Sequence, residues 1–443
     1  MNILDEFDTI AAVSTPFGTG GVGVIRISGE KAFDIIKKIF TNNNFEPRKF
    51  SHGYIVDGET KIDEVIVLPF FAPNSYTGEN VVEIQCHGGI QVVQNILNLV
   101  LKNGARPAEK GEFTKRAFLN KRMDLSQAES VADIIHSKTG EFAKISMKNL
   151  SGVLKEKIND IKNDIFEVLS RITAGIDFPE DVKEPEYSYL IESIENIIKK
   201  IDSVLSGAEA SNIMRQGITV AIAGKPNVGK SSVFNALLSL NRAIVTEIAG
   251  TTRDILRETL DLGIPVTLVD TAGIRDEGEN KVEQIGIEYS KQSLNEADLV
   301  LFIYDAKQGI QKEDEEILDF IKSKKYIVAA NKADLVQERK ESVIYISAQS
   351  GEGIEELKKS LTNQVKEIEP DSLEFVTNVR QQTCLNRAKT SLDQALLASQ
   401  IGELQDLISI DIKAALLALD ELTGELITDD ILDNIFENFC IGK

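Results

Sequence analysis

A glycine-rich octapeptide, GKPNVGKS at residues 224–231, has the spacing G-x-x-x-x-G-K-[ST] that cradles phosphate groups. It follows the apolar run TVAIAG and precedes the helix-like run SSVFNALL, the context that this loop requires. Gly224 and Gly229 let the backbone turn its N–H groups toward phosphates. Lys230 can reach the β and γ oxygens, and the Ser231 hydroxyl can meet Mg²⁺. The stretch therefore predicts a site for a nucleoside triphosphate.

Two motifs further along the chain add a metal position and a base. DTAG at 270–273 follows the apolar run IPVTLV and would place Asp270 beside the metal and the N–H of Gly273 near the γ-phosphate. NKAD at 331–334 ends another apolar run. Its Asp334 can accept two hydrogen bonds from the N1–H and exocyclic amine of guanine, a donor pair that adenine lacks.

Asn331 and the Lys332 stem would secure the guanine ring, and the backbone of Ser347 and Ala348 would contact its oxygen. Four ordered motifs, each at the end of an apolar run, predict a GTP-binding domain.

The stretch TEIAGTTRD at 246–254 resembles the first switch of translation-factor-related GTPases, in which a threonine closes over Mg²⁺. Thr252 is the first choice for that threonine, and Thr251 is its rival. Ile274 stands where Ras-like proteins carry the glutamine that orients the attacking water, a task that an apolar side chain cannot perform. Another group must therefore stabilise the charge that develops during GTP hydrolysis. Asn227 is similar to the ligand with which members of this group hold K⁺; the alternative is a loop residue that caps its own backbone.

The N-terminal run STPFGTGGVGVIRISG contains Gly18-x-Gly20-x-x-Gly23, which is literally a dinucleotide-binding pattern. The run continues as a strand where such a site needs a helix, so a glycine-rich turn between strands is the better interpretation. Two charged residues, Arg26 in VIRIS and Glu83 in VVEIQCHGG, interrupt apolar strands. They are either solvated outward-facing positions or part of a site.

The last five residues of the sequence, FCIGK at 439–443, contain a cysteine four positions from the end. A prenylation signal fits poorly, because Gly442 and Lys443 occupy its final positions and residues 403–443 hold ten acidic residues against two lysines. Another role for this segment is needed.

Composition excludes several classes of protein. The 443 residues carry a formal charge of −21, which disfavours unspecific attraction to nucleic acid or anionic membranes. No run is long and apolar enough to span a membrane, and the start lacks a secretory signal, so we expect a cytoplasmic protein without a membrane partner. Three dispersed cysteines predict no disulfide framework. A local basic run, 101–122 with net charge +5, is either a solvated surface or a nucleic-acid contact.

The spacing of apolar residues along the sequence predicts a multidomain α/β and all-α protein. Short alternating runs before residue 120 indicate strands, and spacings of three and four indicate long helices over 121–212 and again after 371. Strongly apolar runs between 213 and 370 indicate a mainly parallel sheet covered on both faces. We expect a domain at 1–120, a discontinuous helical domain at 121–212 and 371–443, and an inserted domain at 213–370. Two separate helical modules are the alternative.

The chain as a whole resembles the MnmE (TrmE) family of tRNA modification GTPases. The resemblance rests on STPFGTGGVGVIRISG, NSYTGENVVEIQCHGG, RPAEKGEFTKRAFLNKRMDLSQAE, the GTPase motifs with IAGTTRD and VEQIGIE, and FCIGK. It implies an N-terminal α/β folate-binding domain that forms a homodimer, a discontinuous helical domain, and an inserted Ras-like P-loop GTPase domain.

The resemblance also assigns residues to ligands. A 5-formyl- or 5,10-methylene-tetrahydrofolate would bind through Arg26, Glu83, Arg122 and Lys443. Mg²⁺ would be held by Ser231 and Thr252, and K⁺ by Asn227, Thr246, Ile248 and Thr251. The catalytic set would be Lys230, Asn227, Glu283, which would reach a water indirectly, and Cys440, a participant in carbon transfer unless it is only a packed apolar side chain. The expected GTP contacts are Gly224, Asn227, Val228, Gly229, Lys230, Ser231, Ser232, Thr246, Glu247, Ile248, Ala249, Gly250, Thr251, Thr252, Asp270, Thr271, Ala272, Gly273, Asn331, Lys332, Asp334, Ser347 and Ala348.

The implied activity is a K⁺-dependent GTPase that acts with the flavoprotein MnmG (GidA), which would carry FAD and use NADH. Together they would place an aminomethyl or carboxymethylaminomethyl group at C5 of the wobble uridine of certain tRNAs. Two alternatives stay open from the residues alone. One is a ribosome-assembly GTPase without modification chemistry, and the other is a folate-binding regulator whose GTPase controls dimerisation.

Overall fold

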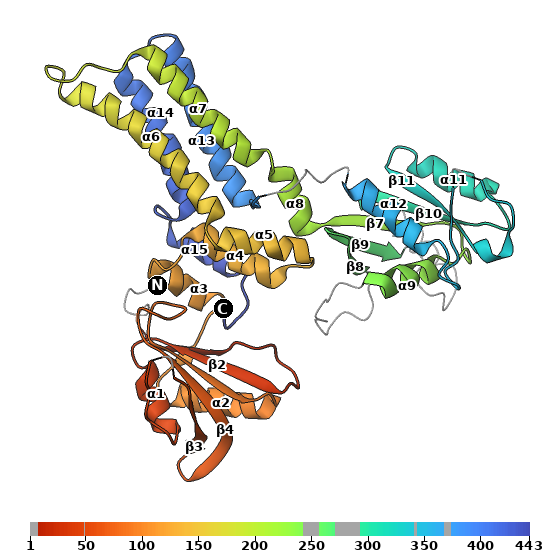
Figure 1. Ribbon diagram of the computed structural model, residues 1–443, viewed down its shortest axis with the longest axis horizontal. Helices are drawn as coiled ribbons and strands as arrows, with labels where there is room; N and C mark the ends of the chain where they lie inside the picture. The colour runs from red at the N-terminus through yellow and green to blue at the C-terminus, as the bar shows by residue number, and fades with distance from the viewer. Residues whose placement is uncertain (1–7, 48, 242–256, 271–292, 341–342, 367–373) are drawn as a thin grey trace. The chain divides into compact units, whose positions relative to one another are not determined.

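The structure is a computed structural model that describes residues 8–47, 49–241, 257–270, 293–340, 343–366 and 374–443. The chain divides into two compact units (Figure 1). The first is Met1–Ala132 with Leu416–Lys443, and the second is Asp133–Ala415.

A six-stranded sheet organises the first unit. Its order is β3-β4-β5-β2-β1-β6, antiparallel except for the β1–β6 pair. The strands are β1 (Ile10–Val13), β2 (Val22–Ser28), β3 (Ser51–Asp57), β4 (Thr60–Phe70), β5 (Val81–His87) and β6 (Arg106–Pro107). The strands predicted from the short alternating runs before residue 120 are thus present. The glycine-rich run before β2 is a turn between antiparallel strands, as expected.

Helices cover both faces of this sheet. Isoleucines of α1 (Ala32–Ile39) and apolar residues of α2 (Ile90–Lys102) join the larger core, because their spacing of three and four places them on one side of each helix. On the other face, Phe113 of α3 (Glu112–Leu119) packs with Ile10, Ala12 and Ala108, and Tyr76 borders that cluster.

The end of the sequence belongs to the first unit. Helix α15 (Asp429–Phe436) contacts α3, and its buried Phe436 stacks at a tilt on buried Phe439. Gly111 must be a glycine here, because its φ is +67° and an added Cβ would lie 2.9 Å from both phenylalanines. Residues 439–443 then run along the start of α3.

The second unit consists of a helical part and an inserted sheet, and its helical part is made of long helices. They are α4 (Leu125–His136, which begins in the first unit), α5 (Gly140–Leu150), α6 (Val153–Asp177), α7 (Tyr187–Leu205), α8 (Ala208–Gln216), α13 (Val379–Gln400) and α14 (Gln405–Thr423, which ends in the first unit). Helix α7 packs on both α6 and α13 (Figure 1). The helical segments before and after the inserted part therefore form one module, and the alternative of two separate modules is excluded.

The inserted part is a second six-stranded sheet, in the order β12-β11-β10-β7-β9-β8. Its strands are β7 (Ile218–Ala223), β8 (Arg257–Asp261), β9 (Pro265–Asp270), β10 (Leu299–Asp305), β11 (Tyr326–Asn331) and β12 (Ile344–Tyr345). Only β8, which the sequence analysis does not predict, is antiparallel to its neighbour. The predicted mainly parallel sheet is confirmed.

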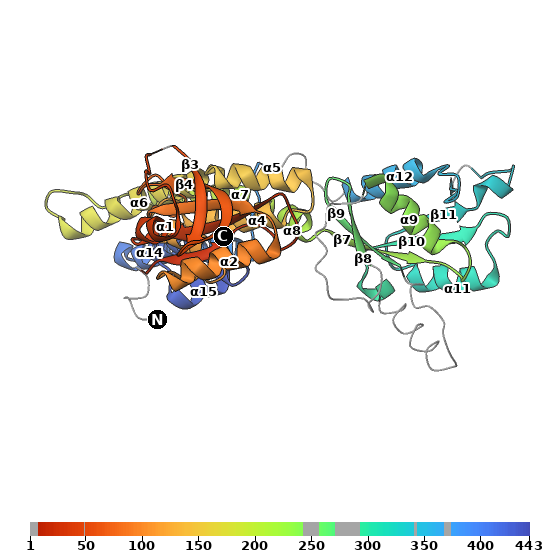
Figure 2. The ribbon, with the colours of Figure 1, turned by 90° about the horizontal axis from the view of Figure 1, so that it is seen from below.

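Both faces of this sheet are covered, as its apolar strands require. Apolar residues of α9 (Lys230–Asn241) and α12 (Ile354–Lys366) pack on one face, and those of α11 (Lys312–Ile321) pack on the other (Figure 2). A short 3₁₀ turn, η2 (Ala333–Leu335), follows β11. Within the described ranges, no helix has both the length and the apolar character needed to cross a membrane.

Candidate functional site

The loop between β7 and α9 has the backbone shape that a phosphate cradle needs. Gly224 has φ +148°, and a Cβ there would lie 2.1 Å from the carbonyl oxygen of Ile303. Gly229 has φ +92°, and a Cβ there would lie 2.3 Å from Nδ2 of Asn331. Side chains at either position would clash with backbone or with a buried amide, so both glycines are required by space as well as by conformation.

Lys230 begins α9 and its ammonium group lies inside the loop. Nζ donates to the carbonyl oxygens of Gly224 and Lys225, at 2.7 and 2.9 Å. The following hydroxyls, Ser231 and Ser232, are exposed at the first turn of the helix, where N–H groups and the helix dipole favour an anion. These three side chains are thus gathered where the sequence predicts a phosphate site.

Asn227 sits at the tip of the loop with φ +64°, a left-handed conformation that asparagine tolerates better than most residues. Its side chain is exposed and has no hydrogen-bond partner among the described residues. It therefore does not cap the backbone of its own loop in this structure.

The Asn331 side chain connects the NKAD motif to the phosphate loop and to Ala348 by hydrogen bonds. Asn331 ends β11 and is buried; its Nδ2 donates to the Val228 carbonyl at 2.8 Å, and its Oδ1 accepts from the Ala348 N–H at 3.2 Å. The phosphate loop, the NKAD motif and the Ser347–Ala348 pair are therefore held as one arrangement at the carboxyl edge of the sheet. Ser347 is buried, and Asp334 is exposed at that edge.

Asp305, which the sequence analysis misses, positions Lys332. It ends β10 directly beside Asn331, and its Oδ2 lies 2.7 Å from Nζ of Lys332. Burial works to raise the pKa of this carboxyl, but hydrogen bonds from Lys332 and from backbone N–H groups outweigh it and hold the pKa below the usual range. Lys332 also donates to the Asn227 carbonyl at 3.0 Å. The sequence could have indicated Asp305, because it directly follows an apolar run, as Asp270 and Asn331 do.

Some of the predicted contacts lie outside the described residues. These are Thr246, Glu247, Ile248, Ala249, Gly250, Thr251, Thr252, Thr271, Ala272, Gly273 and Glu283. Asp270 ends β9 as predicted, and only its backbone is described.

A second cluster of charged residues lies in the first unit. The register of β2 and β5 places Arg26 directly opposite Glu83. Oε1 of Glu83 accepts a hydrogen bond from Nε of Arg26 at 2.9 Å and forms an ion pair with Nη2, also at 2.9 Å. Both side chains are mostly buried, with 12% and 20% of their surface exposed. They form a partly desolvated ion pair rather than two solvated outward-facing positions.

Aromatic rings surround this ion pair. The Arg26 guanidinium carbon lies over the ring of Tyr76 at 5.0 Å and over that of Phe113 at 5.5 Å. The guanidinium of Arg122 lies over the same Tyr76 ring at 5.7 Å. Arg26, Glu83, Tyr76 and Arg122 thus form one cluster, in which the exposed side chain of Arg122 contacts the others through the Tyr76 ring.

The last five residues reach this cluster. The backbone carbonyls of Cys440 and Lys443 accept hydrogen bonds from the N–H groups of Gly111 and Phe113, at 3.4 and 3.2 Å. The Gly442 carbonyl accepts from Oγ of Ser14 at 3.2 Å and lies 3.5 Å from Nη1 of Arg26.

Lys443 belongs electrostatically to the same cluster. Burial lowers the pKa of its ammonium group, the Arg26 cation lowers it further, and Glu83 and Cys440 oppose them; the net shift is downward. The structure thus brings together all four residues assigned to the tetrahydrofolate by resemblance. Cys440 is exposed, so it is not a packed core cysteine of this chain.

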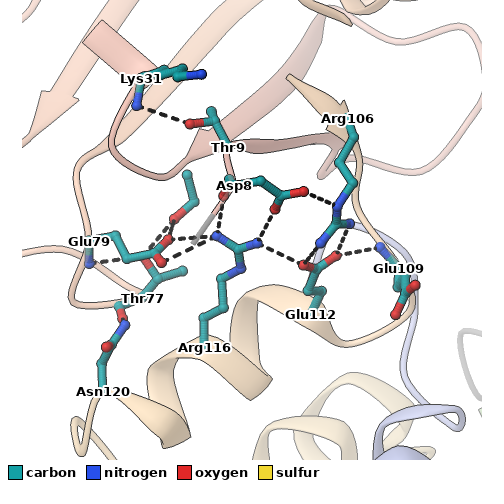
Figure 3. Close-up of polar contacts among 11 residues, drawn as sticks. Asp8, Thr9, Lys31, Thr77, Glu79, Arg106, Glu109, Glu112, Arg116 and Asn120 are labelled. Atoms are coloured by element: carbon teal, nitrogen blue, oxygen red, sulfur yellow. Dashed lines mark hydrogen bonds and ion pairs between the residues drawn. The ribbon is translucent and has the colours of Figure 1, made fainter. Parts of the chain in front are cut away.

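A partly buried charge network supports α3, the helix that carries Phe113 (Figure 3). Arg116 donates to the Asp8 carboxylate, to both Glu79 oxygens at 3.2 Å and to Glu112 at 2.9 Å. Arg106 bridges Asp8 and Glu112 at 2.6 Å each. Burial alone would raise the pKa of Glu112, but hydrogen bonds from Arg106, from the Glu109 N–H and from Arg116 lower it below its usual value.

The ion pairs of this network also show whether the basic run at 101–122 forms a continuous positively charged surface. Arg106 and Arg116 are committed to carboxylates, and Lys115 lies 2.7 Å from Asp433. The run is therefore not a continuous basic surface, and it gives no support to a nucleic-acid contact there.

Two protein-family models match the chain. The model described as GTP-binding protein TrmE N-terminus matches residues 9–122, and the model described as MnmE helical domain matches residues 125–440.

Curated relatives match over nearly the full length. "tRNA modification GTPase MnmE" of Thermotoga maritima is 42% identical over 98% of this chain and 100% of its own length. The protein of the same name from Thermoanaerobacter sp. (strain X514) is 46% identical over 99% of this chain and 100% of its own, and that from Clostridioides difficile is 44% identical over 98% and 99%.

Two solved structures also resemble part of the chain. Aquifex aeolicus Era bound to GDP and aluminium fluoride is 32% identical, covers 39% of this chain and 66% of its own, and has a TM-score of 0.28. The G domain of the Thermotoga maritima FeoB iron transporter is 25% identical, covers 33% and 98%, and has a TM-score of 0.25.

Proposed function

This chain belongs to the MnmE family of tRNA modification GTPases, and from that premise we propose that it serves the modification of C5 of the wobble uridine in certain tRNAs. The group installed is aminomethyl or carboxymethylaminomethyl, and a tetrahydrofolate derivative supplies the one-carbon unit when bound. MnmG is the partner and brings FAD and NADH. The observation that carries the proposal is that the cluster of Arg26, Glu83, Arg122 and Lys443 occurs in one chain with a guanine-nucleotide site.

The residues of the cluster suit a folate. Three cations face one carboxylate there, so the cluster favours an anion, and folates carry carboxylates on a flat aromatic body. Arg122 and Lys443 would bind negative charge, and Glu83 would accept hydrogen bonds from ring N–H groups. Cys440, exposed beside the cluster, is the proposed participant in carbon transfer.

The nucleotide residues have separate tasks. Asp334 would select guanine, Lys230 would hold the β and γ oxygens, and Ser231 with Thr252 would hold Mg²⁺. Asn227 would hold K⁺ together with Thr246, Ile248 and Thr251, and Glu283 would orient water indirectly. When bound, the two metal ions supply positive charge beside the transferred phosphate.

Hydrolysis of GTP is proposed as a conformational step, because loss of the γ-phosphate releases the segments that it orders. The working state is a cytoplasmic homodimer formed through residues 1–120, with GTPase domains at 213–370 that pair when K⁺ is present. The helical domain comprises 121–212 and 371–443.

Mass spectrometry of tRNA nucleosides tests the proposal. Cells without this protein should lose C5-aminomethyl-type wobble uridines, and wild type should restore them. Cys440→Ser and a chain ending at Cys440 should not. Unchanged nucleosides would overturn the proposal and leave the GTPase switch in ribosome assembly, which predicts no folate binding.

The K⁺ assignment has its own test. Asn227→Ala should remove the stimulation of GTP hydrolysis by K⁺, because a methyl group cannot ligate the ion, while GDP affinity stays within about threefold. Hydrolysis rates are compared in K⁺ and in Na⁺ at equal ionic strength, which controls for salt. A variant that is still stimulated by K⁺ would refute the assignment.

A further inference from the structure

We infer that Tyr76 is a positioning residue of the N-terminal ligand site, which holds the guanidinium group of Arg122 beside that of Arg26 for a carboxylate-bearing ligand. The inference rests on the proposed function, since it takes the ligand to be the tetrahydrofolate derivative. It assigns a task to a residue that the sequence motifs leave without one.

The ring of Tyr76 is shared by two cations. The guanidinium carbons of Arg26 and Arg122 lie 5.0 and 5.7 Å from its centroid, both within the range of a cation–π contact. Two guanidinium groups repel one another, and the attraction of each to the Tyr76 ring offsets part of that repulsion when no ligand is bound.

The two arginines depend on Tyr76 to different degrees. Arg26 is fixed independently by Glu83 and by the ring of Phe113. The exposed guanidinium of Arg122 has no carboxylate partner in the described parts of the chain, and the Tyr76 ring is what it lies against. Loss of the ring should therefore release Arg122 and leave Arg26 largely in place.

Tyr76 is itself held at its hydroxyl. Its Oη lies 2.9 Å from Oγ1 of Thr114, a buried residue of α3. The ring therefore cannot move away from α3 without losing a hydrogen bond.

The loop around Tyr76 is fixed to the same helix and to β2 (Figure 3). Thr77 is bonded to Ser28 at 2.7 Å through its hydroxyl and to Asn120 at 2.7 Å through its carbonyl, and Glu79 is paired with Arg116. A loop anchored directly after the aromatic residue costs little further ordering when the ligand binds, which is the condition for effective preorganisation.

The first test is the affinity for 5-formyl-tetrahydrofolate, measured by isothermal titration on the full chain. Tyr76→Leu should weaken binding about tenfold, because the ring that holds Arg122 is lost. Tyr76→Phe keeps the ring and should stay within about threefold of wild type. Tyr54→Leu is the matched control: Tyr54 lies under Lys61 at 3.9 Å on β3, outside the cluster, and its removal should leave the affinity unchanged.

A double-mutant cycle separates positioning from a general structural effect. If Tyr76 acts through Arg122, then Tyr76→Leu combined with Arg122→Ala should bind no more than about twofold weaker than Arg122→Ala alone. Multiplicative losses would overturn the inference, as would a Tyr76→Leu variant with wild-type affinity or a Tyr76→Phe variant as weak as Tyr76→Leu.

The failure of this inference is distinguishable from that of the proposed function. If wild type does not bind 5-formyl-tetrahydrofolate at all, the proposed function fails and the inference fails with it. If wild type binds and the Tyr76 variants behave like wild type, only the inference fails. Hydrogen exchange of the β2 amides in each variant verifies that the unit is folded.

Discussion

Lys443 carries an ammonium group in surroundings that favour its neutral form. Burial and the Arg26 cation hold its pKa below the ordinary value of 10.5. The folded state therefore releases this proton first as the pH rises, so the contribution of Lys443 to the free energy of unfolding increases between the lowered pKa and 10.5. Below that window the amine is charged in both states and available to an anion.

Arg26→Gln should raise the pKa of Lys443, because the substitution removes a repelling cation and leaves Glu83 to attract the ammonium group. The measurement is an NMR titration of the Lys443 ε-methylene in a ¹³C-lysine-labelled protein. Arg122→Gln is the control, since Arg122 is not among the groups that shift this pKa, and it should leave the midpoint in place. An unchanged or lower midpoint in Arg26→Gln would contradict the assigned cause.

At the scale of elements, residues 113–116, one turn of α3, contact most parts of the N-terminal cluster. Within α3, Phe113 supports Arg26 and binds the Lys443 carbonyl, Thr114 anchors Tyr76, and Arg116 pairs with three carboxylates. The rings, the last residues and the loop at 75–79 all depend on where this helix lies.

Arg116→Met should destabilise the first unit by about 1.5–3 kcal/mol, since Glu79 loses its guanidinium partner while Asp8 and Glu112 keep Arg106. Hydrogen exchange of the β2 amides measures the free energy of opening. Lys49→Met, which removes an exposed pair with Glu46, should cost less than about 1 kcal/mol. Equal small effects of the two substitutions would mean that the network adds little stability.

The segment 439–443 depends on one glycine. Gly442 has φ +92°, and a Cβ there would lie 2.3 Å from the Val13 carbonyl oxygen. Gly442→Ala should displace the segment and lower the affinity for 5-formyl-tetrahydrofolate by about tenfold or more. Gly402→Ala is the matched control, because Gly402 has φ +74° with open space around its Cβ position. Wild-type affinity in Gly442→Ala would contradict this account of how the segment is held.

At the scale of the whole molecule, the GTPase core is not built from the GTPase sequence alone. Phe142 and Ile145 of α5 and Val376 join the buried cluster formed by β7, β9 and α9. The Gly140 N–H donates to the Asp261 carboxylate at the end of β8, at 3.3 Å. The helical part therefore contributes to the stability of the sheet that carries the phosphate-loop motif.

Phe142→Ala should lower the protection of the β9 amides against hydrogen exchange by about 3–5 kcal/mol, although Phe142 lies outside the GTPase sequence. Met147→Ala on the same helix is the control, because Met147 is 52% exposed. Equal protection of β9 in both variants would show that α5 does not stabilise this sheet.

The two sites differ in how far the sequence could predict them. The nucleotide motifs are local, so the strand before each loop was enough to place Lys230, Asn331 and Ser347. The N-terminal cluster depends on pairing between distant strands, so the ion pair of Arg26 with Glu83 could not be derived from either strand alone. Family resemblance supplied those residues. It did not supply Tyr76, Arg116 or Asp305, whose roles arise only from tertiary contacts.

The hydrogen bond between Ser14 and Gly442 joins residues 428 positions apart. During synthesis at about 5–20 residues per second, roughly 20–90 seconds separate the appearance of these two residues. The strands that carry Arg26 and Glu83 can pair early, but residues 439–443, which join their cluster, are synthesised after residues 213–370. A nascent chain can therefore form its phosphate loop and its NKAD motif before residues 439–443 reach the cluster of Arg26 and Glu83, and an incompletely translated chain can have the first without the second.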